Sequence, residues 1–409
     1  MLNSSESCPR FHAGPAGRGT GNPLIDKVYR ALLDLSRRQQ NNPWPQELPA
    51  ARKKQVQPEL SVPAGRFCSA RPWMREREKP MKHYEDYTKY VEEQVDRSIP
   101  VIQAVDKGTL SFTPYISNLC SACCRFCSER LSAGGMNAAR LSVCDNYRDK
   151  LVRAFLYARS RPIFLSVSGI EPSESVGQLA LVSEAVRLAE QEGCVFTDRV
   201  MYSNLSGFSK EWDRLSGLVR DLKLTRIESS RHHFDEDINQ SIFRFRPGET
   251  NRTNRVFGET VRRLLPVVPV TFACVIQKSG ISTAGDVLSY LDFARSLGVD
   301  RVVFRELSVF SGEADNSEVA SYITANRVEI MDILQALRPE DFRMISVTRG
   351  YYYYSFQYQY RDMRVLFEMS DYDQMIREHY GDRLHKLIFY ADGSLCRDWN
   401  MKGKIDFEE

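Results

Sequence analysis

Strand-like and helix-like segments alternate along the middle of the chain, and this alternation limits the fold more than any other feature. Apolar runs typical of strands recur between residues 110 and 305, and helical periodicity separates them. Such alternation predicts parallel strands with helices outside the sheet. We therefore predict an α/β fold, a partial (β/α)6 TIM-like barrel, with ligand sites at the carboxyl ends of its strands. The expected strands are 110–116, 163–167, 199–203, 225–229, 270–276 and 301–305, and the expected helices include 83–97, 175–190 and 283–297.

The expected barrel, residues 83–310, follows an N-terminal extension of different character. Residues 1–82 are rich in Pro and Gly and carry 15 Lys and Arg against 7 Asp and Glu. We expect a basic, largely irregular extension with one short helix at 24–38. No groove-reading motif accompanies it, so a nucleic-acid partner is not expected.

The residues after the barrel, 311–409, are expected to form a C-terminal α+β cap. A helix is predicted at 319–337, and an aromatic hairpin is predicted from Tyr351 to Glu368. A cap of this kind would shield a reactive intermediate from water.

The composition predicts a protein of a reducing compartment. No apolar run approaches the ~18 residues of a transmembrane helix, and no secretory leader pattern opens the chain. Closely spaced cysteines in such a chain indicate metal binding or redox chemistry rather than disulfides. We expect a cytoplasmic protein without a membrane partner.

Four of the ten cysteines lie in one short segment after the first expected strand. Cys120, Cys124 and Cys127 are spaced Cys-x3-Cys-x2-Cys, and Cys123 lies between the first two. Three such thiolates can hold three irons of a cubane cluster and leave the fourth iron open. A structural zinc site is the alternative, with Cys123 and Cys144 joining two of the others, although no second ligand pair follows at the usual spacing.

The triplet, with Phe126 directly before its last cysteine, resembles the radical S-adenosylmethionine (SAM) superfamily. The resemblance implies one [4Fe-4S] cluster on Cys120, Cys124 and Cys127, which binds SAM at its open iron. One electron then yields a 5′-deoxyadenosyl radical that abstracts hydrogen from substrate, while the protein positions the reactants. It also implies a reductant such as flavodoxin or ferredoxin.

Further motifs at the expected strand ends carry the same resemblance. Ser-Gly-Ile-Glu-Pro at 168–172 resembles the superfamily's Gly-Gly-Glu-Pro, with Ile170 in place of the second glycine. Ser-Asn-Leu-Ser-Gly at 203–207 is similar to the Thr-Thr-Asn-Gly of relatives. The segment after the fourth strand looks like that of the molybdenum-cofactor GTP cyclase branch. The residues that the resemblance assigns to SAM are Phe126, Gly169, Glu171, Ser203 and Ser229.

Other polar residues near the strand ends are expected to contact substrate. Arg-His-His at 231–233 suits a carboxylate, although hydrogen bonding within the fold is the alternative. In the resembled branch, a nucleotide-binding lysine stands where this chain has Thr271, and an Arg-Phe-Ile-Glu segment is similar to the one ending at Glu306. The expected substrate residues are Asn204, Arg231, His232, Thr271 and Glu306.

The segment Ala-Asp-Gly-Ser-Leu-Cys at 391–396 resembles a hairpin that belongs to a second cluster in relatives. Cys396 is the only cysteine after Cys274, and one thiolate cannot hold a cubane. We therefore predict a single cluster, which argues against GTP cyclisation.

These features together predict a radical SAM enzyme acting on a small polar metabolite, by epimerisation, rearrangement, dehydrogenation or ring formation. Two alternatives stay open at this point. One is a radical SAM maturase of a peptide, and the other is a non-enzymatic zinc-binding interaction protein that uses the basic extension as its contact.

Overall fold

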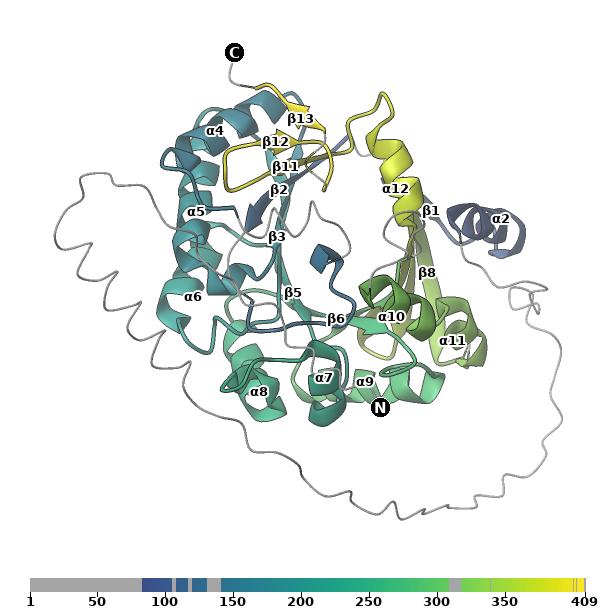
Figure 1. The fold of residues 1–409 in the computed structure, drawn as a ribbon. Helices are drawn as coiled ribbons and strands as arrows, with labels where there is room; N and C mark the ends of the chain where they lie inside the picture. The colour runs from purple at the N-terminus through teal and green to yellow at the C-terminus, as the bar shows by residue number, and fades with distance from the viewer. Residues whose placement is uncertain are drawn as a thin grey trace, which may run out of the picture. The chain divides into compact units, whose positions relative to one another are not determined.

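The computed structural model describes most of the chain from His83 onward (Figure 1). The described residues are 83–104, 108–116, 120–130, 141–308, 318–338, 340–399, 401 and 403–407. All belong to the compact unit Ala70–Glu409. The predicted basic extension, with its helix at 24–38, lies outside the described residues. No helix in the described part of the chain combines the length and apolarity needed to span a membrane.

The strands form one 13-stranded sheet. Its centre consists of six parallel strands, each paired with its neighbour in chain order. This arrangement confirms the predicted α/β fold with a partial (β/α)6 core. The six strands are β2 (Leu110–Ile116), β3 (Ile163–Gly169), β4 (Phe196–Ser203), β5 (Arg226–Ser230), β6 (Val270–Ile276) and β7 (Arg301–Glu306).

Helices between these strands cover one side of the sheet (Figure 1). Two of them match the predicted helices, and α9 begins at a capping box in which Thr283 and Asp286 satisfy each other's backbone N–H groups. The helices are α4 (Tyr147–Ala158), α5 (Val176–Gln191), α6 (Trp212–Asp221), α7 (Glu236–Phe243), α8 (Asn254–Leu264) and α9 (Ala284–Ser296). The short 3-10 turns among them are η3 (Pro172–Glu174) and η4 (Thr250–Arg252).

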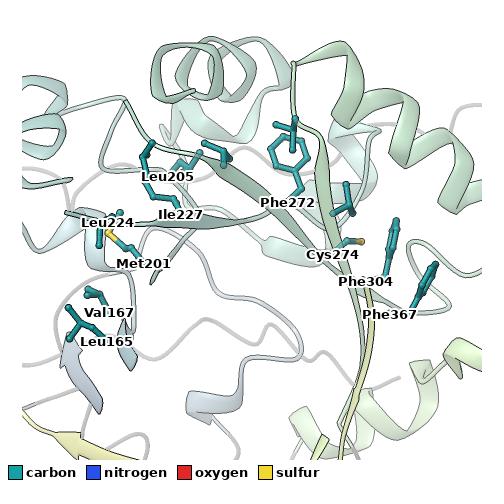
Figure 2. Close-up of a cluster of buried hydrophobic side chains, with 14 of the residues drawn as sticks. Leu165, Val167, Met201, Leu205, Leu224, Ile227, Phe272, Cys274, Phe304 and Phe367 are labelled. Atoms are coloured by element: carbon teal, nitrogen blue, oxygen red, sulfur yellow. The ribbon is translucent and has the colours of Figure 1, made fainter. Parts of the chain in front are cut away.

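The hydrophobic core lies between the sheet and these helices (Figure 2). Phe112 of β2 packs on Phe155 of α4 with ring centroids 4.5 Å apart, and Phe272 of β6 packs on Phe257 of α8 at 5.4 Å. Side chains alternate between the two sides of a strand, so the register identifies the residues that point away from the helices. We call that side the inner face, and its residues include Ser111, Ser168, Tyr202, Glu228, Ser230, Arg305 and Glu368.

The C-terminal residues extend both ends of the core sheet. The predicted aromatic hairpin is confirmed, since β9 (Tyr353–Tyr360) and β10 (Met363–Ser370) are antiparallel, and β10 then pairs with β7. At the other end, β11 (Lys386–Phe389) pairs with β2. The predicted cap region is therefore continuous with the barrel sheet. The remaining strands are β1 (Val101–Gln103), β8 (Phe342–Arg349), β12 (Leu395–Cys396) and β13 (Lys404–Ile405).

The single helix predicted at 319–337 is wrong, because the chain forms two helices there. These are α10 (Glu318–Asn326) and α11 (Ile330–Ala336). The Glu306 carboxylate causes the break, since it accepts from Arg327 at 2.7 Å and from the Ile330 N–H at 2.6 Å. It also accepts from Tyr87 of α2 (Tyr84–Gln94) at 2.7 Å.

One helix that the sequence did not predict crosses the open side of the barrel. This helix, α12 (Tyr372–His379), connects β10 to β11. Because these strands flank opposite ends of the six-stranded core, the connection must span the gap between them (Figure 1). Asp371 caps the helix by accepting from the Gln374 N–H at 2.9 Å.

Candidate functional site

The cysteine loop follows β2 and is hydrogen-bonded to the carboxyl end of α7. The Cys123 N–H donates to the Phe243 carbonyl at 3.0 Å, and the Arg125 N–H donates to the Ile242 carbonyl at 3.2 Å. The last carbonyls of a helix have no partner within it, so the loop supplies the missing donors. These bonds hold the loop at the carboxyl ends of the core strands.

The three cysteines of the predicted triplet are partly buried in the same loop. Burial raises the pKa of Cys124, and the neighbouring Cys127 and Cys120 raise it further. Burial also raises the pKa of Cys120, followed by the charge of Glu171. The charge of each thiolate thus raises the pKa of its neighbours in the loop. Desolvated thiolates that repel one another are stabilised by a shared cationic group, so this donor set fits a metal cluster.

Within the described residues, no three His, Cys, Asp or Glu side chains converge on a position for a single metal ion. A cubane cluster does not need such convergence, because each thiolate binds a different iron. Cys144, which a zinc site would recruit, lies elsewhere. Its N–H donates to the Ala391 carbonyl at 2.9 Å, and the charges that act on its thiol include those of Lys150 and Asp392.

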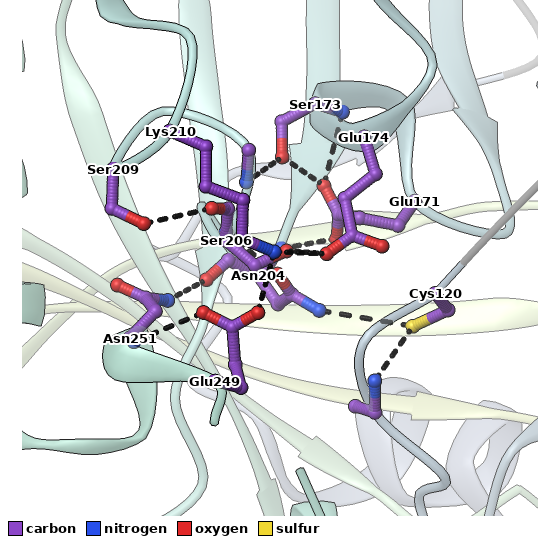
Figure 3. Close-up of polar contacts among 12 residues, drawn as sticks. Cys120, Glu171, Ser173, Glu174, Asn204, Ser206, Ser209, Lys210, Glu249 and Asn251 are labelled. Carbon is purple, nitrogen blue, oxygen red and sulfur yellow. Dashed lines mark hydrogen bonds and ion pairs between the residues drawn. The ribbon is translucent and has the colours of Figure 1, made fainter. Parts of the chain in front are cut away.

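Glu171 joins the ends of β3 and β4 (Figure 3). Its carboxylate accepts from the N–H and hydroxyl of Ser173 at 3.1 and 2.7 Å, from the Ser203 hydroxyl, and from the Asn204 N–H at 2.7 Å. Both oxygens therefore have protein partners. We predicted Glu171 and Ser203 as SAM contacts. In the structure they hydrogen-bond to each other, and Glu171 also holds the backbone of Asn204, the residue after Ser203.

Asn204 is the residue that they orient, and it points at the cysteine loop. Its side-chain amide donates to the Cys120 sulfur at 3.8 Å, while its side-chain oxygen accepts from the Ser206 N–H at 2.8 Å. The Asn251 amide donates to the Asn204 carbonyl at 2.6 Å. Asn204 thus links the carboxyl end of β4 to the predicted cluster ligands (Figure 3).

A charged network supports the same corner. Lys210 pairs with Glu174 at 3.2 Å and with Glu249 at 2.6 Å. Glu174 also accepts from the Ser206 hydroxyl at 2.7 Å. No sequence pattern indicated these residues, because they come from separate βα connections that only the fold brings together.

Gly169 ends β3 where β2 approaches most closely. Its φ is +129°, and a Cβ there would lie 2.5 Å from the Ile116 carbonyl oxygen. Only glycine fits this conformation and this approach. The Ile170 N–H donates to the same carbonyl at 2.9 Å, so glycine at this position keeps the end of β3 beside the cysteine loop.

Ser229, predicted to contact the cofactor, is placed by the register of β5 and β6. Ser229 pairs with Phe272, whose ring packs on the helices, so the Ser229 side chain also faces the helices. Its hydroxyl is buried and has no hydrogen-bond partner among the described residues. The next residue, Ser230, faces the inner side instead.

His232 packs behind the cysteine loop. Its ring meets Phe126 edge-on at 4.9 Å and stacks on Phe243 at 4.4 Å. Burial, followed by the charges of Arg231 and Arg305, lowers the pKa of His232 to about 3. Its Nδ1 accepts from the Val275 N–H at 3.1 Å, so the neutral ring carries its proton on Nε2. His232 thereby holds Phe126 in place beside Cys127.

Arg231 was predicted to contact substrate, but its guanidinium is used within the fold. It donates to the Asn251 and Arg252 carbonyls at 3.3 and 3.1 Å and lies 4.7 Å from the Phe257 ring centroid. Burial lowers its pKa to about 10. The side chain therefore fastens η4, the turn before α8, to the end of β5.

Two further substrate predictions are corrected by position. Thr271 is the second residue of β6, at the strand end opposite the cysteine loop. Glu306 ends β7, but its side chain points to the helix side, where Tyr87, Arg327 and Ile330 use both of its oxygens. Thr271 and Glu306 were chosen from local motifs, which do not reveal the depth or side of a strand residue.

The inner face below the cysteine loop carries charged side chains that sequence analysis missed. Arg305 donates to Glu228 of β5 at 2.7 Å and to Glu368 of β10 at 2.8 Å. Burial raises the pKa of Tyr372 of α12, and the charges of Glu129, Arg305 and Cys127 also act on it. The alternation of side chains along each strand is the sequence feature that could have predicted these charged residues on one face.

Comparisons with known proteins give similarity at low identity. No family model matches the chain, and no curated protein matches it. SuiB from Streptococcus suis bound to S-adenosylmethionine is similar over 80% of this chain and 69% of its own, with 14% identity and a TM-score of 0.43. Native anSMEcpe with bound AdoMet is similar over 48% of this chain and 50% of its own, with 14% identity and a TM-score of 0.38.

A third similar structure is a radical S-adenosylmethionine methyltransferase, TsrM from Kitasatospora setae, with cobalamin and a [4Fe-4S] cluster bound. The similarity covers 50% of this chain and 37% of that one, with 13% identity and a TM-score of 0.33. At these TM-scores a shared activity does not follow from the likeness.

Proposed function

We propose that this protein is a radical SAM enzyme with one [4Fe-4S] cluster and a small polar substrate. The observation that supports this most strongly is the group of partly buried cysteines Cys120, Cys124 and Cys127 in the loop after β2. When bound, such a cluster would supply the electron that splits SAM and generates the radical that abstracts hydrogen.

The neighbouring residues would hold and orient the reactants. Gly169 lets the end of β3 lie directly against the Ile116 backbone, which keeps this strand end beside the cysteine loop. Asn204 donates toward Cys120 and is itself held by Asn251, so a thiolate there would accept a fixed hydrogen bond. Phe126 and His232 close the loop from behind and exclude water on that side.

A polar substrate suits the inner face. Arg305 and Glu368 keep 32% and 23% of their side-chain surface exposed there, whereas Phe304 and Phe367 on the helix side are fully buried. An apolar substrate would have to desolvate these charged groups without replacing their hydrogen bonds, which is unfavourable. The inner face therefore favours a metabolite with several hydrogen-bonding groups.

The electron would come from an external reductant such as flavodoxin or ferredoxin. Arg125, Arg244 and Arg246 are exposed and lie on the cysteine loop or on the segment bonded to it. An acidic redox protein would be attracted to this basic surface. Docking there would bring its cofactor close to the cysteines.

The decisive experiment compares cysteine variants after anaerobic reconstitution. We expect the wild-type protein to be brown, to hold about four irons and to release 5′-deoxyadenosine when reduced with SAM. Alanine at position 120, 124 or 127 should remove both properties. Cys123→Ala is the matched control and should keep them, because Cys123 lies in the same loop but outside the triplet.

If the cysteines bind zinc instead of a cluster, the same experiment should give a different result. A colourless protein with one bound zinc, lost equally in Cys123→Ala, would overturn the proposed function. If the wild-type protein holds iron but releases no 5′-deoxyadenosine, the cluster is structural and not catalytic.

A further inference from the structure

Lys386 is a basic residue of the inner face that the proposed reaction does not yet use. It pairs with Ser111 in the register of β11 and β2. The next pair, Leu387 with Phe112, faces the helices, because Phe112 packs on Phe155 of α4. Lys386 therefore points to the opposite side, the same side as Tyr115.

The Lys386 ammonium has no carboxylate partner among the described residues. Arg226 and Arg305 of the inner face differ from Lys386, since each pairs with carboxylates. The ammonium instead lies 4.4 Å from the ring centroid of Trp399. Burial lowers the pKa of Lys386 to about 8. A partly buried cation without an anion is unfavourable in the free protein, and a ligand anion would remove that penalty.

The surroundings of Lys386 add positive charge. Burial, followed by the charges of Lys386, His385 and Arg397, lowers the pKa of His379 to about 3. The nearby Glu378 is engaged by His385 at 3.3 Å. Burial also lowers the pKa of His385, so the added positive charge is that of Arg397, and no carboxylate of the described residues is placed against Lys386.

Helix α12 connects this region to the cysteine loop. Tyr372, its first residue, lies within reach of the charge of Cys127, and His379, its last, lies within reach of the charge of Lys386. Seven residues of helix correspond to about 10 Å. A small metabolite can span that length, with one end near the cysteines and the other at Lys386.

We propose that Lys386, with Trp399 alongside it, binds an oxyanion of the substrate, either a carboxylate or a phosphate. The ammonium donates charge-assisted hydrogen bonds to the anion, and the indole ring holds the ammonium and packs against the apolar part of the same ligand. This inference rests on the proposed function for the reaction itself, but the anion site can be tested without it.

The test measures the ionisation of Lys386 directly in the full chain. Lysines are reductively methylated with ¹³C-formaldehyde, and the Lys386 signal is assigned by its absence in Lys386→Met. Acetate and inorganic phosphate are then titrated as probes for the two kinds of oxyanion. We expect one of them to shift the Lys386 signal saturably and to raise its apparent pKa.

Lys223 is the matched control, because it is 65% exposed and already pairs with Glu190 at 2.9 Å. Its signal should respond only weakly and without saturation. The proposal would be overturned if neither anion shifted the Lys386 signal, or if the shift were no larger than that of Lys223.

A second measurement needs no variant. Competitive acetylation of the wild-type protein near pH 8, read by peptide mass spectrometry, should show Lys386 protected by the anion that shifts its signal. Unchanged labelling in both anions would count against the site. Neither measurement depends on iron or SAM, so a failed anion site leaves the cluster assignment intact, and a failed cluster leaves these measurements interpretable.

Discussion

On β7, Phe304 faces the helices and is fully buried, whereas the next residue, Arg305, faces inward and keeps a third of its side chain exposed. The same contrast appears on β10 between Phe367 and Glu368. One side of the sheet stabilises the fold by burying apolar surface. The other side carries charge and solvent-accessible surface, which contribute little to stability but suit ligand binding. Substitutions on the two sides should therefore have different consequences.

The largest effect is expected on the helix side. Phe272→Ala would leave a cavity among Phe257, Tyr290 and Phe293 and should lower the free energy of unfolding by about 3–5 kcal/mol. Urea denaturation followed by circular dichroism measures this. Ser230→Ala on the inner face is the control and should change stability by less than about 0.5 kcal/mol. Equal losses in the two variants would contradict the contrast between the sides.

A backbone change at the edge of the site should come next. Gly169→Ala forces a side chain into a positive-φ conformation and against the Ile116 carbonyl, so we expect a loss of about 1–3 kcal/mol. Cluster content should fall with it, because the end of β3 supports the cysteine loop. Gly177→Ala in helix α5, where a Cβ meets no atom within 4 Å, should be neutral or stabilising. Full iron content in Gly169→Ala would show that the loop does not depend on this approach.

The inner-face charges are expected to be coupled rather than individually important. Arg305→Met leaves the Glu228 carboxylate without one of its two arginine partners. Glu228→Gln removes the negative charge with which Arg305 pairs. A double-mutant cycle on unfolding free energy should give a coupling of about 1–2 kcal/mol, less than for a fully buried pair because Arg305 is partly exposed. Additive effects would show that the two side chains do not interact.

The smallest effect is a pH dependence at His379. The pKa of His379 is lowered to about 3 by burial and by Lys386, His385 and Arg397, while the unfolded chain takes up the proton near pH 6.5. The unfolded state therefore binds more protons between these values, and stability should fall as pH drops from 6.5, by at most about 1.4 kcal/mol per pH unit. His379→Gln, which keeps a polar partner for Tyr351 at this position, should flatten the profile between pH 5 and 6.5. An unchanged slope would assign the dependence to other groups.

Local patterns were enough for the core of the fold. The six parallel strands were predicted within a few residues, and β2 and β6 were predicted at their observed bounds. Helix α9 was also predicted, at 283–297, from the alternation of helical and strand-like segments. Each of these features depends on neighbours along the chain, through side-chain alternation, helical spacing and backbone capping. The spacing of Cys120, Cys124 and Cys127 is equally local, which is why one short loop could indicate a cluster.

Tertiary structure decided which polar residues share the inner face and which do not. Ser229 and Ser230 are adjacent in sequence, yet pairing with β4 and β6 sends them to opposite sides of the sheet. Lys386 and Trp399 meet the region of the cysteine loop only because β11 joins β2 and α12 spans the open side of the barrel. Strand register and crossover connections are set by packing between distant segments. The sequence therefore determined the elements and the cysteine triplet, while the side and depth of each polar residue were determined by the assembled sheet.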